Sequence, residues 1–393
     1  EISRSDSGAI NLVKTAEAIN NIIEKSKTQK EKSICFVTGV PGAGKTLAGL
    51  NLANERHQFG DDEEHAVFLS GNGPLVAVLQ EALARNNIEN STERITKGDA
   101  LQKAKSFIQN IHHFRDDAIS VDTAPIEKVV VFDEAQRAWN NDKTTSFMKI
   151  KKGIADFDMS EPEFLISVMD RHQDWAVIIC LIGGGQEINT GEAGLPEWFS
   201  AIRTLYPHWN VYVSNQITDI EYTADQDLEK LFSGMKYNPV PDLHLSTSIR
   251  SFRSEHVSNF VKSLLDCDKE KAKQLFSELK EKYPIVLTRD FEKAKQWLKD
   301  NARGNERYGI TASAKAHRLR PYGIYVESDL DAPQWFLNDK DDVRSSYYLE
   351  YVATELHIQG LELDWTCVGW DANFRYDDGE WSYNQFTGTK WNK

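Results

Sequence analysis

Short apolar runs without polar alternation recur in the first half of the chain, at residues 34–38, 66–70, 129–132 and 176–182. Strands that are buried on both faces have this pattern, as in a parallel sheet covered by helices. Stretches with helical periodicity lie between the runs. The alternation of strands and helices predicts a doubly wound α/β domain.

The same alternation restarts after a polar connection near residues 219–242. There we expect a helical pair, a strand, a helix and two further strands, at residues 258–282, 284–288, 290–302, 308–313 and 365–370. The pattern therefore predicts two domains, residues 1–240 and 241–393, the second of them incomplete at its C-terminal end. Residues from about 140 to 175 lack the pattern and indicate an insertion or lid on the first domain.

Composition and charge narrow the class of protein. No run approaches the roughly 18 apolar residues that span a bilayer, and the first residues lack the apolar centre of a secretion signal, so we expect a cytoplasmic protein with no membrane partner. The four cysteines are far apart and form no C-x-x-C pair, which indicates reduced thiols. A net charge of −14 argues against nonspecific coating of nucleic acid but leaves room for a local basic groove.

Residues 39–46, GVPGAGKT, match the pattern G-x-x-x-x-G-K-[ST] between a buried strand and a helix. Glycines let backbone N–H groups converge on phosphate oxygens, and the helix N-terminus favours negative charge. We expect Lys45 to reach the β- and γ-phosphates of ATP and Thr46 to ligate Mg²⁺. A glycine turn that binds nothing is the alternative. The predicted cradle consists of Gly39, Pro41, Gly42, Ala43 and Gly44.

Two acidic residues follow the apolar run 129–132, at the strand end where ligands bind in open α/β sheets. We expect Asp133 to bind Mg²⁺ and Glu134 to deprotonate the attacking water. Carboxylates also favour helix starts, which is the structural alternative. The next buried strand ends in glycines and Gln186. Taken alone, this stretch favours a surface loop, but after two nucleotide elements we predict that Gln186 is a polar sensor of the γ-phosphate.

Seven stretches carry a family resemblance: VTGVPGAGKT, FLSGNGPLVAVL, VVVFDEAQRAW, CLIGGGQEINTGEAG, LSTSIRSF, ITASAKAHRLR and TELHIQGLELDWTCVGW. Together they resemble superfamily 1 helicases, and more closely the bacterial Schlafen-like DNA/RNA helicase-domain proteins, from about residue 33 to 388. The resemblance implies two RecA-like P-loop NTPase domains with parallel sheets flanked by helices, and ATP bound between them.

The resemblance also implies roles for residues of the second domain. Arg250 matches the arginine directed at the γ-phosphate, and Arg253 is the alternative residue for this role. A surface salt bridge is the alternative interpretation of either arginine. Gln359, Gly360 and Glu362 match a motif that lines the nucleotide cleft. Exposed acids around a turn are the alternative interpretation of Glu362.

Contacts with single-stranded DNA or RNA are implied for two segments. The first comprises Ser70, Asn72, Gly73 and Pro74, whose small polar residues and N–H groups after a strand can bond phosphates, although a plain loop is almost as good an interpretation. The second comprises Thr354 and His357.

The chain departs from the family pattern in two respects. It ends at TGTKWNK without the later arginine-finger motif. We expect that the natural chain continues; impaired hydrolysis is the alternative. The glutamine that reads adenine in many helicases has no assigned counterpart, because Gln29 lies in a lysine-rich turn. The spacing between motifs also leaves too little chain for large accessory domains, which favours translocation or remodelling over fast unwinding of duplexes.

Three functions remain in competition. The leading hypothesis is an ATPase motor that uses ATP and Mg²⁺ to close two domains on single-stranded DNA or RNA. The second is an NTP-dependent switch that controls a protein partner or a fused effector domain without translocation, for example in bacterial defence. A small-molecule kinase is the weakest, because no segment suggests a pocket for a phosphate acceptor.

Overall fold

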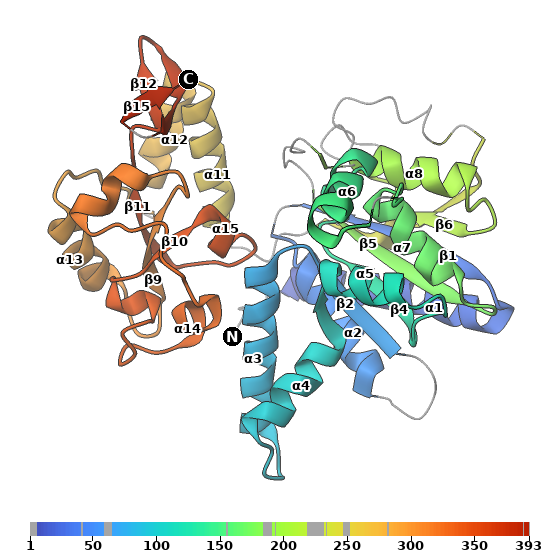
Figure 1. Cartoon of the computed structure of the whole chain (residues 1–393). Helices are drawn as coiled ribbons and strands as arrows, with labels where there is room; N and C mark the ends of the chain where they lie inside the picture. Colours follow the sequence, from blue (N-terminus) through green and yellow to red (C-terminus); the bar gives the residue numbers. More distant parts are fainter. Residues whose placement is uncertain are drawn as a thin grey trace. The chain divides into compact units, whose positions relative to one another are not determined.

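The chain divides into two compact units. The computed structural model describes residues 6–40, 42–58, 65–154, 156–183, 191–192, 194–217, 232, 234–246, 252–280, 283–387 and 389–392. The first unit comprises Glu1–Gly71 and Gln102–Arg250, and the second Asn72–Leu101 and Ser251–Lys393. The division differs from the expected domains in two places: residues 72–101 belong with the second unit, and residues 241–250, which include Arg250, belong with the first. Each unit is an α/β structure with a parallel sheet flanked by helices, as predicted (Figure 1).

The sheet of the first unit is parallel, with the strand order β3-β2-β4-β5-β1-β6-β7 and β8 beside the end of β1. The four apolar runs lie in β1, β2, β4 and β5, and the residues of β5 are all buried. β5 lies between β1 and β4, so the strands that precede the glycine loop and the acidic pair are not neighbours. The strands are β1 Lys32–Gly39, β2 His65–Ser70, β3 Ile108–Asn110, β4 Glu127–Phe132, β5 Ala176–Gly183, β6 Asn210–Val213, β7 Tyr237–Pro239 and β8 His244–Leu245.

Helices cover both faces of this sheet. Alternate strand residues such as Phe36 and Cys180 join a core with apolar residues of α5, α7 and α8. On the opposite face α2 packs closely, because Gly49 lies against Val131 and Leu181. The helices are α1 Asp6–Gln29, α2 Lys45–Gln58, α5 Ile111–Ser120, α6 Asn141–Phe147, α7 Glu161–Asp170 and α8 Gly194–Thr204, with α4 Lys97–Phe107 crossing the unit boundary.

Residues 140–175 were expected to form an inserted lid. The C-terminal part of this segment, which contains α7, packs into the core of the first unit. Ser160 caps α7, and the apolar side chains of α7 from Phe164 to Met169 are core residues. α6 and a short π-helix, Met148–Lys152, precede it. Because α7 packs on β5, it cannot leave the unit as a lid would without exposing the core.

The second unit contains a smaller parallel sheet, β10-β9-β11, and two antiparallel hairpins, β12-β13 and β14-β15. Its helices α11, α12 and α13 lie where helical periodicity predicts them. The expected strand at 284–288 is wrong: these residues form no strand, and the side chain of Leu287 is 99% exposed. The elements are α3 Gly73–Asn90, α11 Phe252–Leu265, α12 Lys269–Leu279, α13 Phe291–Asn301, β9 Tyr308–Ala312, α14 Ala332–Leu337, β10 Val352–Thr354, α15 Glu355–Ile358, β11 Trp365–Gly369, β12 Phe374–Asp377, β13 Glu380–Tyr383, β14 Gln385–Thr387 and β15 Lys390–Asn392.

Candidate functional site

The glycine loop connects β1 to α2 as the sequence predicts. Gly42 and Gly44 have φ angles of 75° and 84°, which favour glycine over residues with a side chain. At Gly39 a Cβ would lie 2.8 Å from the Cβ of Leu245. Ala43 is buried, and Pro41 lies outside the described residues. The loop is therefore tightly turned and leaves no space for side chains at its first glycine.

Residues near position 245 contact the glycine loop through backbone hydrogen bonds and apolar packing. The Val40 N–H donates to the Leu245 carbonyl at 3.0 Å, and β8 pairs with the end of β1. Leu245 also shares an apolar cluster with Leu12 of α1 and Ala43. Asn11 accepts a bond from the Ser246 N–H at 2.9 Å. These supports were not predicted, although Leu245 opens the LSTSIRSF stretch.

The ammonium group of Lys45 folds back onto the loop that precedes it. It donates to the carbonyls of Gly39 at 2.8 Å and Val40 at 3.3 Å. The N–H groups of Lys45 that bind these two carbonyls can also donate to phosphate oxygens. A bound triphosphate would therefore replace the carbonyls as the acceptors of Lys45.

Asp133 follows β4 and lies beside the start of α2. The Thr46 hydroxyl donates to its two carboxylate oxygens, at 3.2 and 3.1 Å, and the Asp133 N–H donates to the Leu69 carbonyl at 2.9 Å. Asp133 is only 3% exposed. Burial first, and then the negative charge of Glu134, raise the pKa of Asp133 to about 7, while Thr46 and Lys45 lower it. A carboxylate and a hydroxyl in this position fit Mg²⁺, because a cation would offset the cost of burying the charge.

Glu134 has a left-handed backbone conformation, with φ 52° and ψ 46°, and begins the 3₁₀ turn Ala135–Arg137. Such a conformation is uncommon for a residue with a side chain and is frequent at functional sites. The amide of Gln136 donates to the Glu134 carboxylate and accepts from the Gly183 N–H at 3.0 Å. Gln136 was not predicted, and its only signal was a polar residue in the stretch DEAQRAW.

Gln186 and Arg250 lie outside the described residues, as does the side chain of Arg253. Among the described residues of the first unit, Arg137 pairs with Glu192 at 3.1 Å. The structure therefore brings together the glycine loop, Lys45, Thr46, Asp133 and Glu134 in the first unit, and these predictions of position are consistent with one site.

In the second unit, the predicted nucleic-acid segment that begins at Asn72 contacts the 359–360 turn, which the resemblance assigned to the nucleotide cleft. The side chain of Asn72 caps α3 by accepting from the Leu75 N–H at 3.2 Å, and it donates to the Gln359 carbonyl at 2.7 Å. Gly360, with a φ of 82°, lies against Leu75. Gly73 and Pro74 form the first turn of α3. The contact between α3 and the 359–360 turn was not predicted.

The remaining residues predicted to bind nucleic acid or nucleotide lie in different surroundings. Thr354 and His357 form a capping box at the start of α15, with the Thr354 N–H donating to His357 Nδ1 at 3.1 Å. Burial lowers the pKa of His357. Glu362 is exposed, and Ser70, in the first unit, is buried at the end of β2. Ser70 is thus not assembled with the other predicted residues within one unit.

The sequence and the structure were compared with those of known proteins. The family model for the Schlafen group 3, DNA/RNA helicase domain, matches residues 32–393. The chain belongs to this family. Among solved structures, the helicase domain of Pyrococcus furiosus Hef is similar with 15% sequence identity over 85% of each chain and a TM-score of 0.28. A comparison with curated proteins finds no match.

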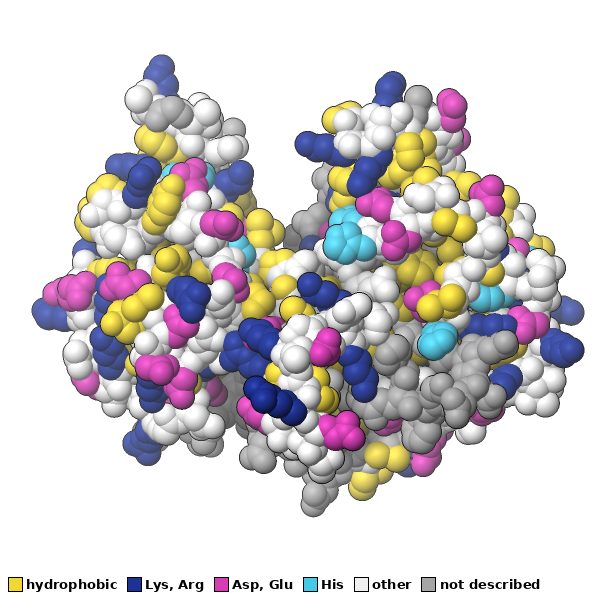
Figure 2. All heavy atoms as spheres, turned by 60° about the horizontal axis from the view of Figure 1, so that its bottom comes forward, with side chains coloured by type: hydrophobic (Ala, Val, Ile, Leu, Met, Phe, Trp, Pro, Cys, Tyr) yellow, Lys and Arg dark blue, Asp and Glu magenta, His cyan; other side chains and the backbone are white. Residues whose placement is uncertain are grey.

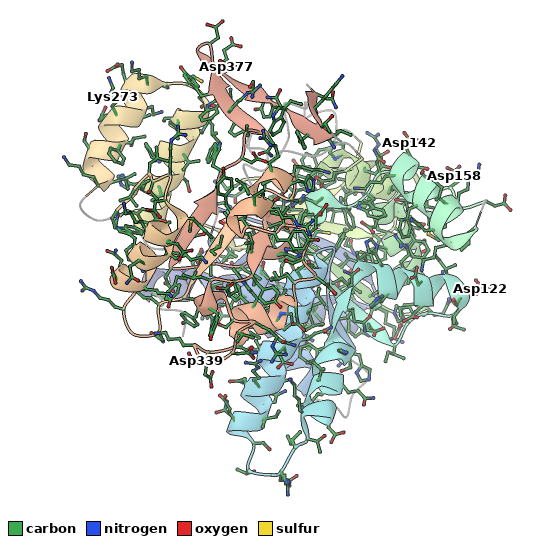
Figure 3. All side chains as sticks on the ribbon, turned by 60° about the vertical axis from the view of Figure 1, so that its left-hand side comes forward. Asp122, Asp142, Asp158, Lys273, Asp339 and Asp377 are labelled. Carbon is green, nitrogen blue, oxygen red and sulfur yellow. The ribbon has the colours of Figure 1, made fainter. Side chains whose placement is uncertain are left out.

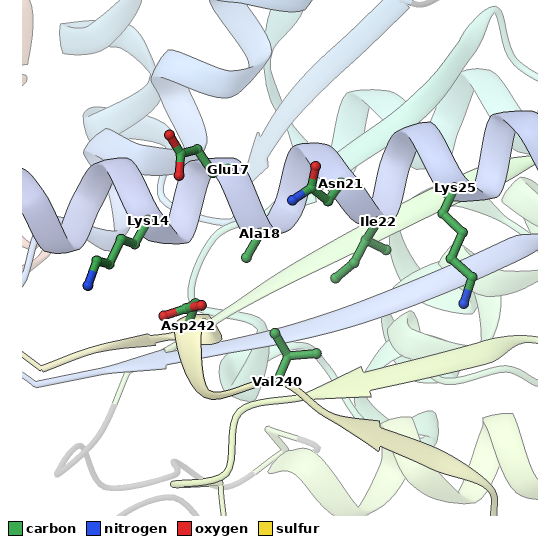
Figure 4. Close-up of a pocket in the computed structure, with 8 residues that line it drawn as sticks. All are labelled: Lys14, Glu17, Ala18, Asn21, Ile22, Lys25, Val240 and Asp242. Atoms are coloured by element: carbon green, nitrogen blue, oxygen red, sulfur yellow. The ribbon is translucent and has the colours of Figure 1, made fainter.

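A separate groove of this helicase domain lies between α1 and residues 240–242 (Figure 4). It has a volume of about 520 Å³. Its lining includes no residue of the glycine loop and neither acid of the pair 133–134. The groove consists of Lys14, Glu17, Ala18, Asn21, Ile22, Lys25, Val240 and Asp242.

Several acidic side chains of the helicase domain are exposed to solvent. Figure 3 shows Asp122, Asp142, Asp158, Asp339 and Asp377 at the periphery, and all five are exposed. On the face in Figure 2, Lys and Arg side chains lie among Asp and Glu side chains. In the described part of the chain, no helix has both the length and the apolar character needed to cross a membrane. Asp133 is buried, in contrast to these five aspartates.

Proposed function

We propose that the chain is an ATP-dependent nucleic-acid motor of the superfamily 1 helicase type, which hydrolyses Mg-ATP and acts on single-stranded DNA or RNA. The contact between Thr46 and Asp133 carries this proposal. It joins the glycine loop to the acidic strand end, although β5 separates their strands in the sheet. Membership of a helicase-domain family supports the same function.

Each residue of the site has a defined task in ATP hydrolysis. Lys45 exchanges the carbonyls of Gly39 and Val40 for phosphate oxygens, and Thr46 and Asp133 hold Mg²⁺. The metal, when bound, neutralises charge on the phosphate oxygens. Glu134 accepts the proton of the attacking water. In the same proposal, Gln186 senses the γ-phosphate and Arg250 neutralises charge on it.

Binding of the nucleic-acid strand is proposed for the surface of the second unit at the start of α3. Asn72 joins this helix start to the 359–360 turn, so the two segments present one surface. The N-terminus of α3, an 18-residue helix, offers N–H groups and a favourable dipole to a phosphate backbone. Contacts of this type are independent of base sequence, which suits a translocating protein.

A switch without translocation is the second candidate function. The net charge of −14 favours it, because an acidic surface repels the phosphates of long polynucleotides. In this function the same site would bind and hydrolyse Mg-ATP, and the bound state would recruit a protein partner.

A titration of ATPase activity with nucleic acid separates the two functions. The rate is measured with single-stranded and duplex DNA and RNA at two salt concentrations, with the variant Lys45→Ala as the control for contaminating ATPases. We expect a single strand to stimulate the rate and high salt to weaken the stimulation, because phosphate contacts release counterions. A rate that is unaffected by every polynucleotide at both salt concentrations would exclude the motor and favour the switch.

A further inference from the structure

The side-chain amide of Gln136 bridges two backbone segments of the first unit. It accepts from the Gly183 N–H at 3.0 Å, at the end of β5, and it donates to Oε2 of Glu134. Gln136 is 4% exposed; its bond with Gly183 is buried, and its bond with Glu134 is partly buried. A buried amide with both ends engaged holds its partners in a defined geometry.

The orientation of this amide follows from its partners. A backbone N–H can only donate, so the group of Gln136 that faces Gly183 must be the carbonyl oxygen. The NH₂ group then faces Glu134 and donates to its carboxylate. Glutamate at position 136 would keep the acceptor for Gly183 but would lose the donor for Glu134.

The surroundings restrict the Glu134 carboxylate further. A Cβ at position 183 would lie 2.7 Å from Glu134 Oε2 and 2.9 Å from Gln136 Nε2, so only glycine leaves the required space. Trp198 holds the turn between the two residues by donating from Nε1 to the Ala135 carbonyl at 2.9 Å. Glu134 has a left-handed backbone conformation at the start of this turn, and its carboxylate accepts a hydrogen bond from Gln136.

We infer that Gln136 is a positioning residue, which holds Oε2 of Glu134 so that Oε1 is presented to the attacking water. This inference rests on the proposed function, in which Glu134 is the general base. Holding a base within reach of its proton contributes to the rate of the chemical step and not to nucleotide binding. Replacing the amide should therefore lower kcat and leave KM for ATP nearly unchanged.

The test compares ATPase kinetics of Gln136→Glu and Gln136→Met with the wild type and with Glu134→Gln. Gln173→Glu, an exposed glutamine of the same unit, is the matched control for the change of charge. We expect kcat to fall about 10- to 100-fold in both Gln136 variants, with KM within about 3-fold of the wild type. A role limited to satisfying the Gly183 N–H predicts that Gln136→Glu behaves like the wild type.

The outcomes are distinguishable from a failure of the proposed function. If the wild type hydrolyses ATP and Glu134→Gln does not, wild-type kcat in both Gln136 variants overturns the inference alone. If the wild type itself is inactive, the proposed function fails and the inference fails with it. Should the Gln136 variants not fold, Gly183→Ala decides: it keeps Gln136 but displaces the carboxylate, and unchanged kcat in this variant overturns the inference.

Discussion

The hydroxyl of Thr46 donates to both carboxylate oxygens of Asp133, at 3.2 and 3.1 Å. If both groups hold Mg²⁺, removing the hydroxyl should weaken metal binding and spare the fold. We expect the Mg²⁺ concentration for half-maximal ATPase activity to rise about 10- to 100-fold in Thr46→Val. Thr46→Ser retains the hydroxyl and is the control, which should stay close to the wild type. An unchanged Mg²⁺ requirement in Thr46→Val would remove Thr46 from the metal site.

The raised pKa of Asp133, about 7, predicts a pH-dependent cost of folding in the absence of nucleotide. An acid whose pKa is higher in the folded protein holds more protons there, so the free energy of unfolding falls as pH rises from about 4 to 7. Asp133→Asn removes this charge and keeps an acceptor for Thr46.

The matched measurement is thermal or denaturant unfolding of Asp133→Asn and the wild type at pH 5 and pH 8. We expect the variant to gain stability relative to the wild type on going to pH 8, on the order of a few kcal/mol. Asp122→Asn, at an exposed aspartate, should show no such trend. A stability difference that is the same at both pH values would contradict the burial of an ionisable Asp133.

Gly39 leaves no space for a side chain, because a Cβ would lie 2.8 Å from the Cβ and 3.0 Å from the carbonyl oxygen of Leu245. Gly39→Ala should therefore displace the glycine loop, reduce ATP affinity at least 10-fold and lower stability by about 1 to 3 kcal/mol. Gly98→Ala, in the first turn of α4, is the control, because a Cβ at Gly98 would lie 3.7 Å from its nearest neighbour, Oγ1 of Thr96. Nucleotide binding by isothermal calorimetry checks both variants, and equal affinities would show that the loop does not bind ATP as described.

Arg85 fixes α3 within the second unit. Its guanidinium donates to Glu81 at 2.8 Å, to the Leu337 carbonyl at 3.1 Å and to Asn338 at 2.6 Å. We expect Arg85→Met to cost about 1 to 3 kcal/mol of local stability and to speed hydrogen exchange of residues 73–90. Arg94→Met, at an exposed position, should leave that exchange unchanged. Equal protection of α3 in both variants would show that the helix is held by other contacts.

The parts of the site that could be predicted from sequence are specified by local patterns. Buried runs of four to seven apolar residues indicate the strands β1, β2, β4 and β5, and the glycine loop and the acidic pair follow the ends of β1 and β4. The glycines of the loop and the acids at 133 and 134 follow directly in the chain. Short-range signals of this kind need no knowledge of partners far away in sequence.

The parts that could not be predicted depend on distant partners. PIVLT has the composition of a strand, but a strand also needs a neighbouring edge for its hydrogen bonds, and none of the described strands pairs with it. The grouping of α3 with the second unit depends on bonds such as Asn72 to Gln359, which are 287 residues apart. Likewise, the role of Gln136 is visible only once Gly183 is placed beside it.

Substitution of the proposed general base tests the central claim most directly. Single-turnover hydrolysis and equilibrium binding of Mg-ATP are measured for Glu134→Gln, with Lys45→Ala as a comparison that should lose binding. The account predicts that hydrolysis by Glu134→Gln falls at least 100-fold, while its affinity for Mg-ATP stays within about 3-fold of the wild type. Turnover of Glu134→Gln at the wild-type rate would contradict the assignment of this site as the centre of ATP hydrolysis.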